Sequence, residues 1–350
     1  MRSPYRLALL ALTSIAIGLA GCASPPVAAT AIPPGALPGW EKDDLGGIAQ
    51  ALDAQCALAR PPGHWARTCA MLPEPSRLRG FIEANFLAWP MQAPGDVRPG
   101  MLTGYHEPLL TGSRNRESSG QVPLYAPPAP PRDGTLLPDR AAIDAGALAA
   151  TPVVAWADDP VEAFFLHVQG SGRLRLRDGS ILRIGFAGHN GRPYRSIGRE
   201  LIERGELDAA TLDADAIKAW LRAHPGEATA VMQSNPRYVF FRVLEDVDPQ
   251  QGPIGSLGVP LTTMRSIATD PARVPPGALV YLDAAPLAGD EDSHHWRRLG
   301  VAQDTGAAIR GAVRADLFAG SDSEAASIAA RLRQPLAAWL LLPRGEEPRR

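Results

Sequence analysis

Two aspartates near the C-terminal end of the sequence stand among apolar neighbours. Asp304 follows the mostly apolar run 299–303, and Asp316 lies between Ala315 and Leu317. A carboxyl group in such a place either caps a turn or is desolvated, and a desolvated carboxyl can act as a general acid near neutral pH. The spacing alone favours the turn-capping role over the acid. Because burial can still make a carboxyl group an acid, the two residues remain candidates for acid chemistry.

Glycines and isolated polar residues interrupt three segments that otherwise read as apolar strands. The segments are residues 102–105, 168–172 and 301–311. A glycine inside a strand lets another backbone or a ligand approach closely. These segments are candidate walls of a binding site.

Common catalytic motifs are missing from the sequence. Gly170-Ser171-Gly172 is a lone GxG, because Arg175 stands where a dinucleotide motif needs its third glycine. A nucleophile elbow needs glycines two positions before and after its serine, but Gln169 and Arg173 stand there around Ser171. The seven histidines form no HExxH motif, and the acidic stretch before His294-His295 predicts an exposed loop there. We predict no catalytic metal and no cofactor.

The composition limits the fold class and the partners. With 35 basic and 37 acidic side chains, the net charge of −2 gives no positive field of the kind that nucleic-acid binders use. The 350 residues, 45% of them hydrophobic, are enough for two folded domains. The 34 glycines and 35 prolines indicate many turns between short strands, so we expect a mostly β fold and no nucleic-acid partner.

Periodicity places the elements. Alternating apolar residues on both sides of Asp178-Gly179 predict a hairpin over 173–186, and its arginines favour a solvated sheet face over a phosphate cradle. Further strands are predicted at 153–156, 163–169, 239–243, 279–282, 300–303, 309–317 and 339–342. Helices are predicted near 48–56, from the N-cap Ser76 to before Pro90, at 197–203, and at 214–223 with Asp213 as N-cap.

The N-terminus reads as an export signal. Residues 1–21 have a basic start and an apolar run too short to span a bilayer, and 19–22 resemble the lipobox of bacterial lipoproteins. The resemblance implies lipidation of Cys22 and, with Ala23 after it, an outer-membrane anchor facing the periplasm. Residues 22–44 are rich in Pro and Ala and read as a tether. Cys56 and Cys69 then remain as a disulfide or, equally, as two buried thiols.

In their order along the chain, these segments resemble the membrane-bound lytic murein transglycosylase A family over about residues 45–343. No single segment is specific, but the set is. The matching segments are the lipobox and residues 103–105, 168–172, 188–191, 194–198, 233–236, 239–241, 259–261, 274–277 and 304–318.

The resemblance implies a double-psi β-barrel domain from residues 45–108 and 245–343, with a second β-rich domain inserted at 109–244, a few peripheral helices and a tail at 344–350. A glycan groove would lie between the domains. Asp316 would be the catalytic acid and Asp304 a second carboxylate close to it. The groove contacts would come from Thr103, Gly104, Tyr105, Gln169, Ser171 and Gly172.

The implied enzyme is a peptidoglycan lytic exotransglycosylase, a carbon–oxygen lyase, although the residues themselves leave endo and exo cleavage open. It would cleave the bond from N-acetylmuramic acid to N-acetylglucosamine without water and leave 1,6-anhydromuramoyl ends. One Asp can serve as acid and then as base, whereas an ordinary glycosidase needs two carboxylates. The implied partners are glycan strands, the outer membrane through the lipid, and a cell-wall synthesis complex, with the protein itself a monomer.

Two positions depart from the family pattern, and two other functions compete. Ala307 replaces a usual glycine, and His106-Glu107 follow Tyr105 where uncharged residues are usual. Glu107 is either a charge on the groove rim, which we favour, or a second groove carboxylate. A non-catalytic peptidoglycan-binding lipoprotein is the main alternative. A hydrolase that adds water is less favoured because no paired second carboxylate is evident.

Overall fold

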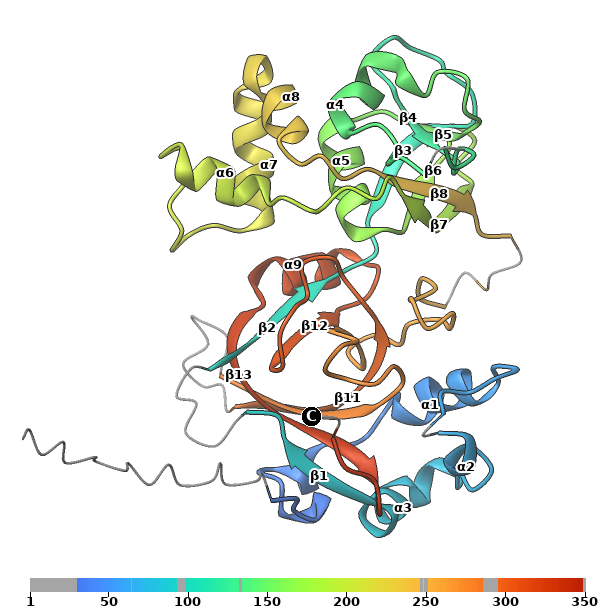
Figure 1. Cartoon of the computed structure of the whole chain (residues 1–350), viewed down its shortest axis with the longest axis vertical. Coiled ribbons are helices and arrows are strands. Elements are labelled where there is room, and N and C mark those ends of the chain that lie inside the picture. Colours follow the sequence, from blue (N-terminus) through green and yellow to red (C-terminus); the bar gives the residue numbers. More distant parts are fainter. Residues whose placement is uncertain are drawn as a thin grey trace, which may run out of the picture.

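The computed structural model describes residues 30–63, 65–92, 99–131, 134–245, 248, 251–285 and 295–348. Within them, two β-sheets form two domains, one above the other in Figure 1. The predicted signal peptide, Cys22 and residues 23–29 lie outside the described residues, as does His294. Over the described ranges, every helix is too short or too polar to cross a bilayer.

A closed barrel of six strands forms the lower domain. Its order is β13-β10-β11-β9-β12-β2, and β2 pairs back with β13, so the barrel has no free edge. The β9–β11 and β2–β12 pairs are parallel, and β1 extends the sheet beyond β13. The strands are β1 (Phe86–Pro90), β2 (Gly100–Tyr105), β9 (Ser266–Thr269), β10 (Leu279–Ala284), β11 (Trp296–Asp304), β12 (Arg314–Phe318) and β13 (Arg333–Pro343).

Alternation along these strands explains the barrel core. On β12, Ala315 and Leu317 are buried while Arg314 and Asp316 are only half-buried, because successive side chains of a strand point to opposite faces. The inward residues, among them Leu102 and Ile267, form one apolar cluster. The predicted strand 309–317 begins only at Arg314, since residues before it form turns around Gly311.

The prediction that residues 22–44 form a tether is wrong from Ile32 onward. Leu37 and Trp40 are buried on the outside of the barrel, where η1 (Pro34–Ala36) and η2 (Trp40–Lys42) pack, and Ile32 pairs with Ala88 of β1. Asp43 forms a buried ion pair with Arg265, at 2.8 Å from Oδ1 to Nη2. The proline-rich composition therefore reflects short turns of a packed segment.

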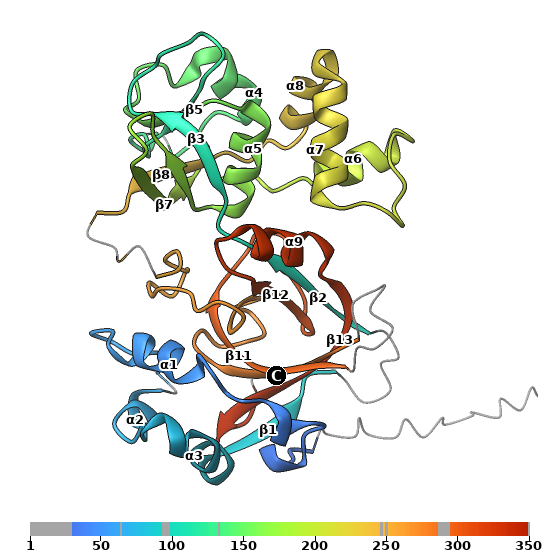
Figure 2. The same cartoon turned by 180° about the vertical axis from the view of Figure 1, so that it is seen from behind.

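Small helices complete this side of the barrel (Figure 2). They are α1 (Ile48–Cys56), α2 (Ala66–Cys69), η3 (Pro75–Arg77) and α3 (Leu78–Asn85). The sequence predicted Ser76 as the N-cap of α3. In the structure Ser76 lies inside η3 and does not cap that helix. A disulfide joins Cys56 to Cys69, with their Cα atoms 5.4 Å apart, and this decides between the two states that the sequence left open.

The upper domain contains the second sheet, in the order β4-β5-β3-β6-β7-β8. The predicted hairpin is confirmed as β6 and β7, joined at Asp178-Gly179. The strands are β3 (Leu109–Ser113), β4 (Val122–Tyr125), β5 (Val153–Ala157), β6 (Gly172–Arg175), β7 (Ile181–His189) and β8 (Val239–Val243). A barrel with a second β-rich domain inserted between β2 and β9 is the mostly β fold that the resemblance implied.

Residues 163–169 form part of a helix, not the predicted strand. Asp159 caps α5 (Pro160–Gln169) by accepting the backbone N–H of Val161, and Pro160 occupies its first turn. One face of α5 packs on the sheet and the other on a helical subdomain. The remaining helices are α4 (Arg140–Ala142), η4 (Ile143–Ala147), α6 (Ile197–Glu203), α7 (Ala214–Ala223), α8 (Pro225–Gln233) and, on the barrel, α9 (Ser323–Arg331).

Candidate active site between the two domains

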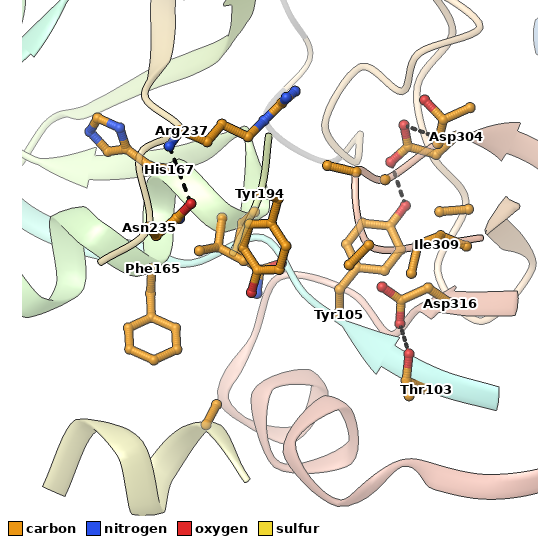
Figure 3. Close-up of a pocket in the computed structure, with 18 of the residues that line it drawn as sticks. Thr103, Tyr105, Phe165, His167, Tyr194, Asn235, Arg237, Asp304, Ile309 and Asp316 are labelled. Atoms are coloured by element: carbon orange, nitrogen blue, oxygen red, sulfur yellow. Dashed lines mark hydrogen bonds between the residues drawn. The ribbon is translucent and has the colours of Figure 1, made fainter. Parts of the chain in front are cut away.

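A groove runs between the barrel and the inserted domain. Two adjoining cavities of about 280 and 570 Å³ form it, and both are lined by Gln169 and Arg237 of the inserted domain and by residues 304–307 of the barrel. The smaller cavity contains both aspartates that the sequence singled out (Figure 3). Together the cavities are large enough for several sugar units.

The register of three barrel strands brings Asp304 and Asp316 together. Strand β9 lies between β11 and β12, and its Ala268 is in register with both aspartates. Neighbouring strands lie about 4.8 Å apart, so the two aspartate backbones are roughly 10 Å apart across one strand. The small side chain of Ala268 lines the groove between them.

Thr103 holds the Asp316 carboxyl by a side-chain hydrogen bond. Thr103, its register partner on the parallel strand β2, donates its hydroxyl to Asp316 Oδ1 at 2.5 Å. The same hydroxyl oxygen accepts Arg314 Nη2 at 2.8 Å. Within the described part of the chain, Oδ2 of Asp316 has no hydrogen-bond partner, so this oxygen can present a proton to a bound molecule.

The environment of Asp316 favours its protonated form. Burial raises the pKa of Asp316 above its ordinary value, and the nearby charge of Asp304 raises it further. The hydrogen bond from Thr103 and the charge of Arg314 lower the pKa, but burial prevails. The arrangement is that of a carboxylic acid able to donate a proton at a higher pH than a free aspartate.

Asp304 is surrounded by donors instead. Its Oδ1 accepts the backbone N–H groups of Ser256 and Thr305, both at 2.9 Å, and its Oδ2 accepts the Tyr105 hydroxyl at 2.8 Å. Burial raises the pKa of Asp304 above its ordinary value, and these hydrogen bonds offset only part of that rise. Because both oxygens already accept hydrogen bonds, Asp304 is suited to remain an acceptor and to act as a fixed charge.

Tyr105 of β2 donates its hydroxyl to the Asp304 carboxylate. Burial raises the pKa of its phenol well above the ordinary value, and the charges of Asp304 and Asp316 add to this, so the hydroxyl stays protonated and donates. Its ring lies 5.5 Å from that of Phe318, measured between centroids. Tyr105 therefore fixes the direction of the Asp304 carboxylate.

The opposite wall comes from the inserted domain, and sequence reasoning missed part of it. Tyr194, Phe165 and Arg237 line the groove there (Figure 3). Asn235 is buried, and its Oδ1 accepts the backbone N–H groups of Arg195 and Arg237 at 3.1 and 3.2 Å. Asn235 and Tyr194 belong to segments that matched the family, which was the signal available; Phe165 lay in a segment misread as a strand.

Five of the six predicted groove contacts line the cavities. Thr103, Gly104 and Tyr105 border the smaller one, Gln169 borders both, and Ser171 borders the larger. Gly172 is different: it is buried in β6, and a Cβ there would lie 2.5 Å from Leu166 Cδ1. That glycine is needed for helix–sheet packing and does not border either cavity.

Glu107 is neither a rim charge nor a groove acid. It is buried, and its carboxylate pairs with Arg173 Nε at 2.7 Å and Arg183 Nη2 at 3.3 Å. Ser321 Oγ of the barrel donates to the same carboxylate at 2.8 Å. The prediction that the arginines of the hairpin form a solvated face is thus wrong at Arg173, which turns toward Glu107.

Among the residues that the structure describes, no cluster of three or more metal-binding side chains occurs.

Comparison with known proteins gives two family matches. Residues 101–242 match the MltA specific insert domain, and residues 265–342 match the 3D domain. The membrane-bound lytic murein transglycosylase A of Escherichia coli K12 is 34% identical over 71% of this chain and 67% of its own length. The enzyme of the same name from Vibrio cholerae is 33% identical over 62% of this chain and 58% of its own length.

Solved structures agree with these matches. A membrane-bound lytic murein transglycosylase from Agrobacterium tumefaciens superposes with a TM-score of 0.81 at 30% identity, covering 91% of this chain and 98% of that one. Lytic transglycosylase LtgG of Burkholderia pseudomallei is 42% identical, with a TM-score of 0.60 over 91% and 96%. E. coli MltA with bound chitohexaose superposes with a TM-score of 0.65 at 28% identity, covering 86% of this chain and 84% of that one. On these matches and on the barrel with its insert, the chain belongs to the membrane-bound lytic murein transglycosylase A family.

Proposed function

We propose that this protein is a lytic transglycosylase that cleaves the β-1,4 bond from N-acetylmuramic acid to N-acetylglucosamine in peptidoglycan. The observation that supports this most is Asp316 in the groove wall, with a raised pKa and with Oδ2 not engaged by the described protein groups. A related enzyme was solved with chitohexaose, a chain of N-acetylglucosamine, which supports a glycan as the occupant of the groove.

Asp316 acts first as an acid. Its proton passes from Oδ2 to the bridging oxygen, and the bond from that oxygen to the muramoyl C1 breaks as positive charge develops on the sugar. Asp304, whose ionised form is favoured by its hydrogen-bond donors, stabilises that charge as a carboxylate and keeps the Asp316 proton available. Two carboxylates thus take different roles because their hydrogen-bond partners differ.

Asp316 then acts as a base. The muramoyl C6 hydroxyl attacks C1, and its proton passes to the Asp316 carboxylate, so the acid is restored and the product is a 1,6-anhydromuramoyl end. Because the nucleophile is part of the substrate, its effective concentration is on the order of 10⁵ M or more in favourable cases. Such a tethered alcohol takes the place of the water and the second activating carboxylate of a hydrolase.

The remaining groove residues hold the glycan. Thr103, Tyr105, Gln169 and Ser171 offer hydroxyl and amide groups of the kind that bind sugar hydroxyls and acetamido groups. Gly104 lets α9 pack closely against β2, since a Cβ there would lie 2.9 Å from Ala329 Cα.

The protein would act as a monomer on glycan strands, near the complexes that synthesise the cell wall.

Cys22 would anchor the protein to the outer membrane, on the periplasmic side. The lipobox at residues 19–22 supports this placement, and the relatives are named membrane-bound. A lipid anchor brings the groove to the peptidoglycan layer that lies beneath that membrane.

The test is to incubate purified sacculi with the wild-type protein and with Asp316→Asn, Asp304→Asn and Asp53→Asn. We expect wild type and Asp53→Asn, an exposed aspartate on α1, to release muropeptides equally. Asp316→Asn should release none, and Asp304→Asn should be slowed by a factor of about 10²–10³, typical for loss of one electrostatic group. Full activity of folded Asp316→Asn would exclude Asp316 as the acid.

A further inference from the structure

The larger cavity of the groove contains an arginine cluster, defined by Arg237, Arg242 and Arg310. Arg242 lies in β8 of the inserted domain and Arg237 just before that strand, whereas Arg310 comes from the barrel. His189 at the end of β7 lies in the same cavity. Positive groups from both walls of the groove thus line one space.

The cluster makes no ion pair with any carboxylate that the structure describes. Arg237 donates from Nη1 to the backbone carbonyl of Arg192. Arg310 donates from Nη1 to the backbone carbonyls of Gly306 and Ile309. Within the part of the chain that the structure describes, the Nε and Nη2 groups of both arginines make no hydrogen bond. Arg242 is exposed on β8.

The carboxylates near the cluster are already engaged. Asp304 accepts three hydrogen bonds, as described above. Asp270 accepts the backbone N–H groups of Ala272 and Gly311, at 3.2 and 2.9 Å. The charge of Arg310 lowers the pKa of Asp270, but within the described residues neither aspartate contacts the cluster directly.

The basic groups are close enough to affect one another. Burial lowers the pKa of Arg237, and the charge of Arg310 lowers it further. Burial also lowers the pKa of His189, and the charge of Arg237 lowers it further. Like charges that face each other across a cleft raise the local positive potential, which favours an anionic ligand.

A bare glycan does not need this charge. N-acetylglucosamine and its oligomers are uncharged, but the lactyl group of N-acetylmuramic acid bears a stem peptide with free carboxylates on its acidic residues and at its C-terminus. Arginine binds carboxylates through two parallel hydrogen bonds. Beside the cluster, Phe186 and Val168 are 48% and 42% exposed and provide an apolar surface for alanine methyl groups.

We propose that Arg237, Arg242 and Arg310 form a subsite for the carboxylates of the stem peptide, so that the protein prefers peptide-bearing strands. This rests on the proposed function, because the peptide enters the groove attached to the cleaved glycan. The subsite lies in the larger cavity, adjacent to the cavity that contains Asp316.

The test compares peptide-bearing glycan strands with the same strands stripped of peptides by an amidase. The variants are Arg242→Gln with Arg310→Gln, and Arg175→Gln as the matched control, an exposed arginine of β6 outside the groove. We expect the double variant to lose at least about tenfold in kcat/KM on peptide-bearing strands, through KM, because tenfold corresponds to about 1.4 kcal/mol and the loss of a single charge-assisted hydrogen bond already accounts for that much. Its activity on stripped strands should equal that of wild type and of Arg175→Gln.

The outcomes separate the proposals. An equal loss on both substrates would show that the arginines bind sugar, and no loss on either would show that they bind nothing; both results overturn the subsite. High salt should reduce the wild-type preference, since it screens exposed charges. If wild type releases no anhydro product from either substrate, the proposed function itself fails.

Discussion

The two aspartates of the groove differ in what their oxygens contact. Asp316 accepts one hydroxyl and keeps Oδ2 for another molecule, whereas Asp304 accepts hydrogen bonds on both oxygens. The sequence places both among apolar residues but does not show this difference, because Tyr105, Ser256 and Thr103 approach from distant segments. Which aspartate donates the proton is a property of the fold.

At the residue scale, Thr103→Val tests the control of the Asp316 pKa. The Thr103 hydrogen bond lowers this pKa, so its loss should raise it. Because the acid must be protonated, the alkaline limb of the kcat/KM profile should move to higher pH. Thr103→Ser keeps the hydroxyl and should keep the wild-type profile. An unmoved limb in Thr103→Val would contradict the role given to this hydrogen bond.

Asp316→Asn should also stabilise the protein at neutral pH. Burial raises the folded-state pKa of Asp316 above the unfolded value of about 3.9, so the folded state binds the proton more tightly. Stability from this site is therefore present below the unfolded pKa and is lost as pH rises through the folded pKa. An asparagine does not titrate.

Calorimetry at acid and at neutral pH measures this effect. The Tm of Asp316→Asn minus that of wild type should be near zero in acid and positive at neutral pH. The exposed variant Asp53→Asn is the control. A Tm difference that falls with rising pH would contradict the raised pKa.

At the scale of elements, the sequence predicts what local patterns determine. The hairpin around Asp178-Gly179 and the helix capped by Asp213 are as predicted, because turn and cap chemistry act over a few residues. The run 163–169 is helical because Asp159 and Pro160 start a helix before it, and its apolar residues are buried on two sides. An apolar run that is buried on both sides shows no clear period.

The segment before residue 45 was misread for a related reason. Proline-rich composition indicates an extended chain, but Trp40 is 2% exposed, its ring lies 5.7 Å from that of Tyr281, and its Nε1 donates to Glu83 at 2.7 Å. Tertiary packing of one aromatic residue is not visible in composition.

Trp40→Ala should therefore lower the free energy of unfolding by about 3–5 kcal/mol, the usual cost of removing a large buried aromatic side chain. Urea denaturation measures it, and Trp40→Phe, which keeps a ring, should cost less. A loss near zero in Trp40→Ala would show that this segment is a tether after all.

At the scale of the whole molecule, Glu107 joins the two domains. It lies in the first crossing between them, and its partners Arg173 and Arg183 also donate to the carbonyls of Gln251 and Asp248 in the second crossing. With Ser321 of the barrel, this buried cluster fixes both connections beside the groove. The sequence could not indicate it, because four separate segments meet there.

Glu107→Gln leaves two arginines without their carboxylate. We expect the free energy of unfolding to fall by about 3–5 kcal/mol, as when one partner of a buried ion pair is removed. Arg177→Gln, which breaks only the exposed pairs to Glu117 and Asp158, should cost less than about 1 kcal/mol. Equal losses in the two variants would contradict the structural role of Glu107.

The family, the barrel and the insert followed from ordered sequence segments, but the reaction depends on geometry at one carboxyl group. The direct measurement is mass spectrometry of muropeptides released from sacculi in water labelled with heavy oxygen. We predict muramoyl ends that have lost a water molecule and contain no label, and no release by Asp316→Asn. Labelled reducing ends would show that water attacks C1, and would contradict transfer to the sugar's own hydroxyl.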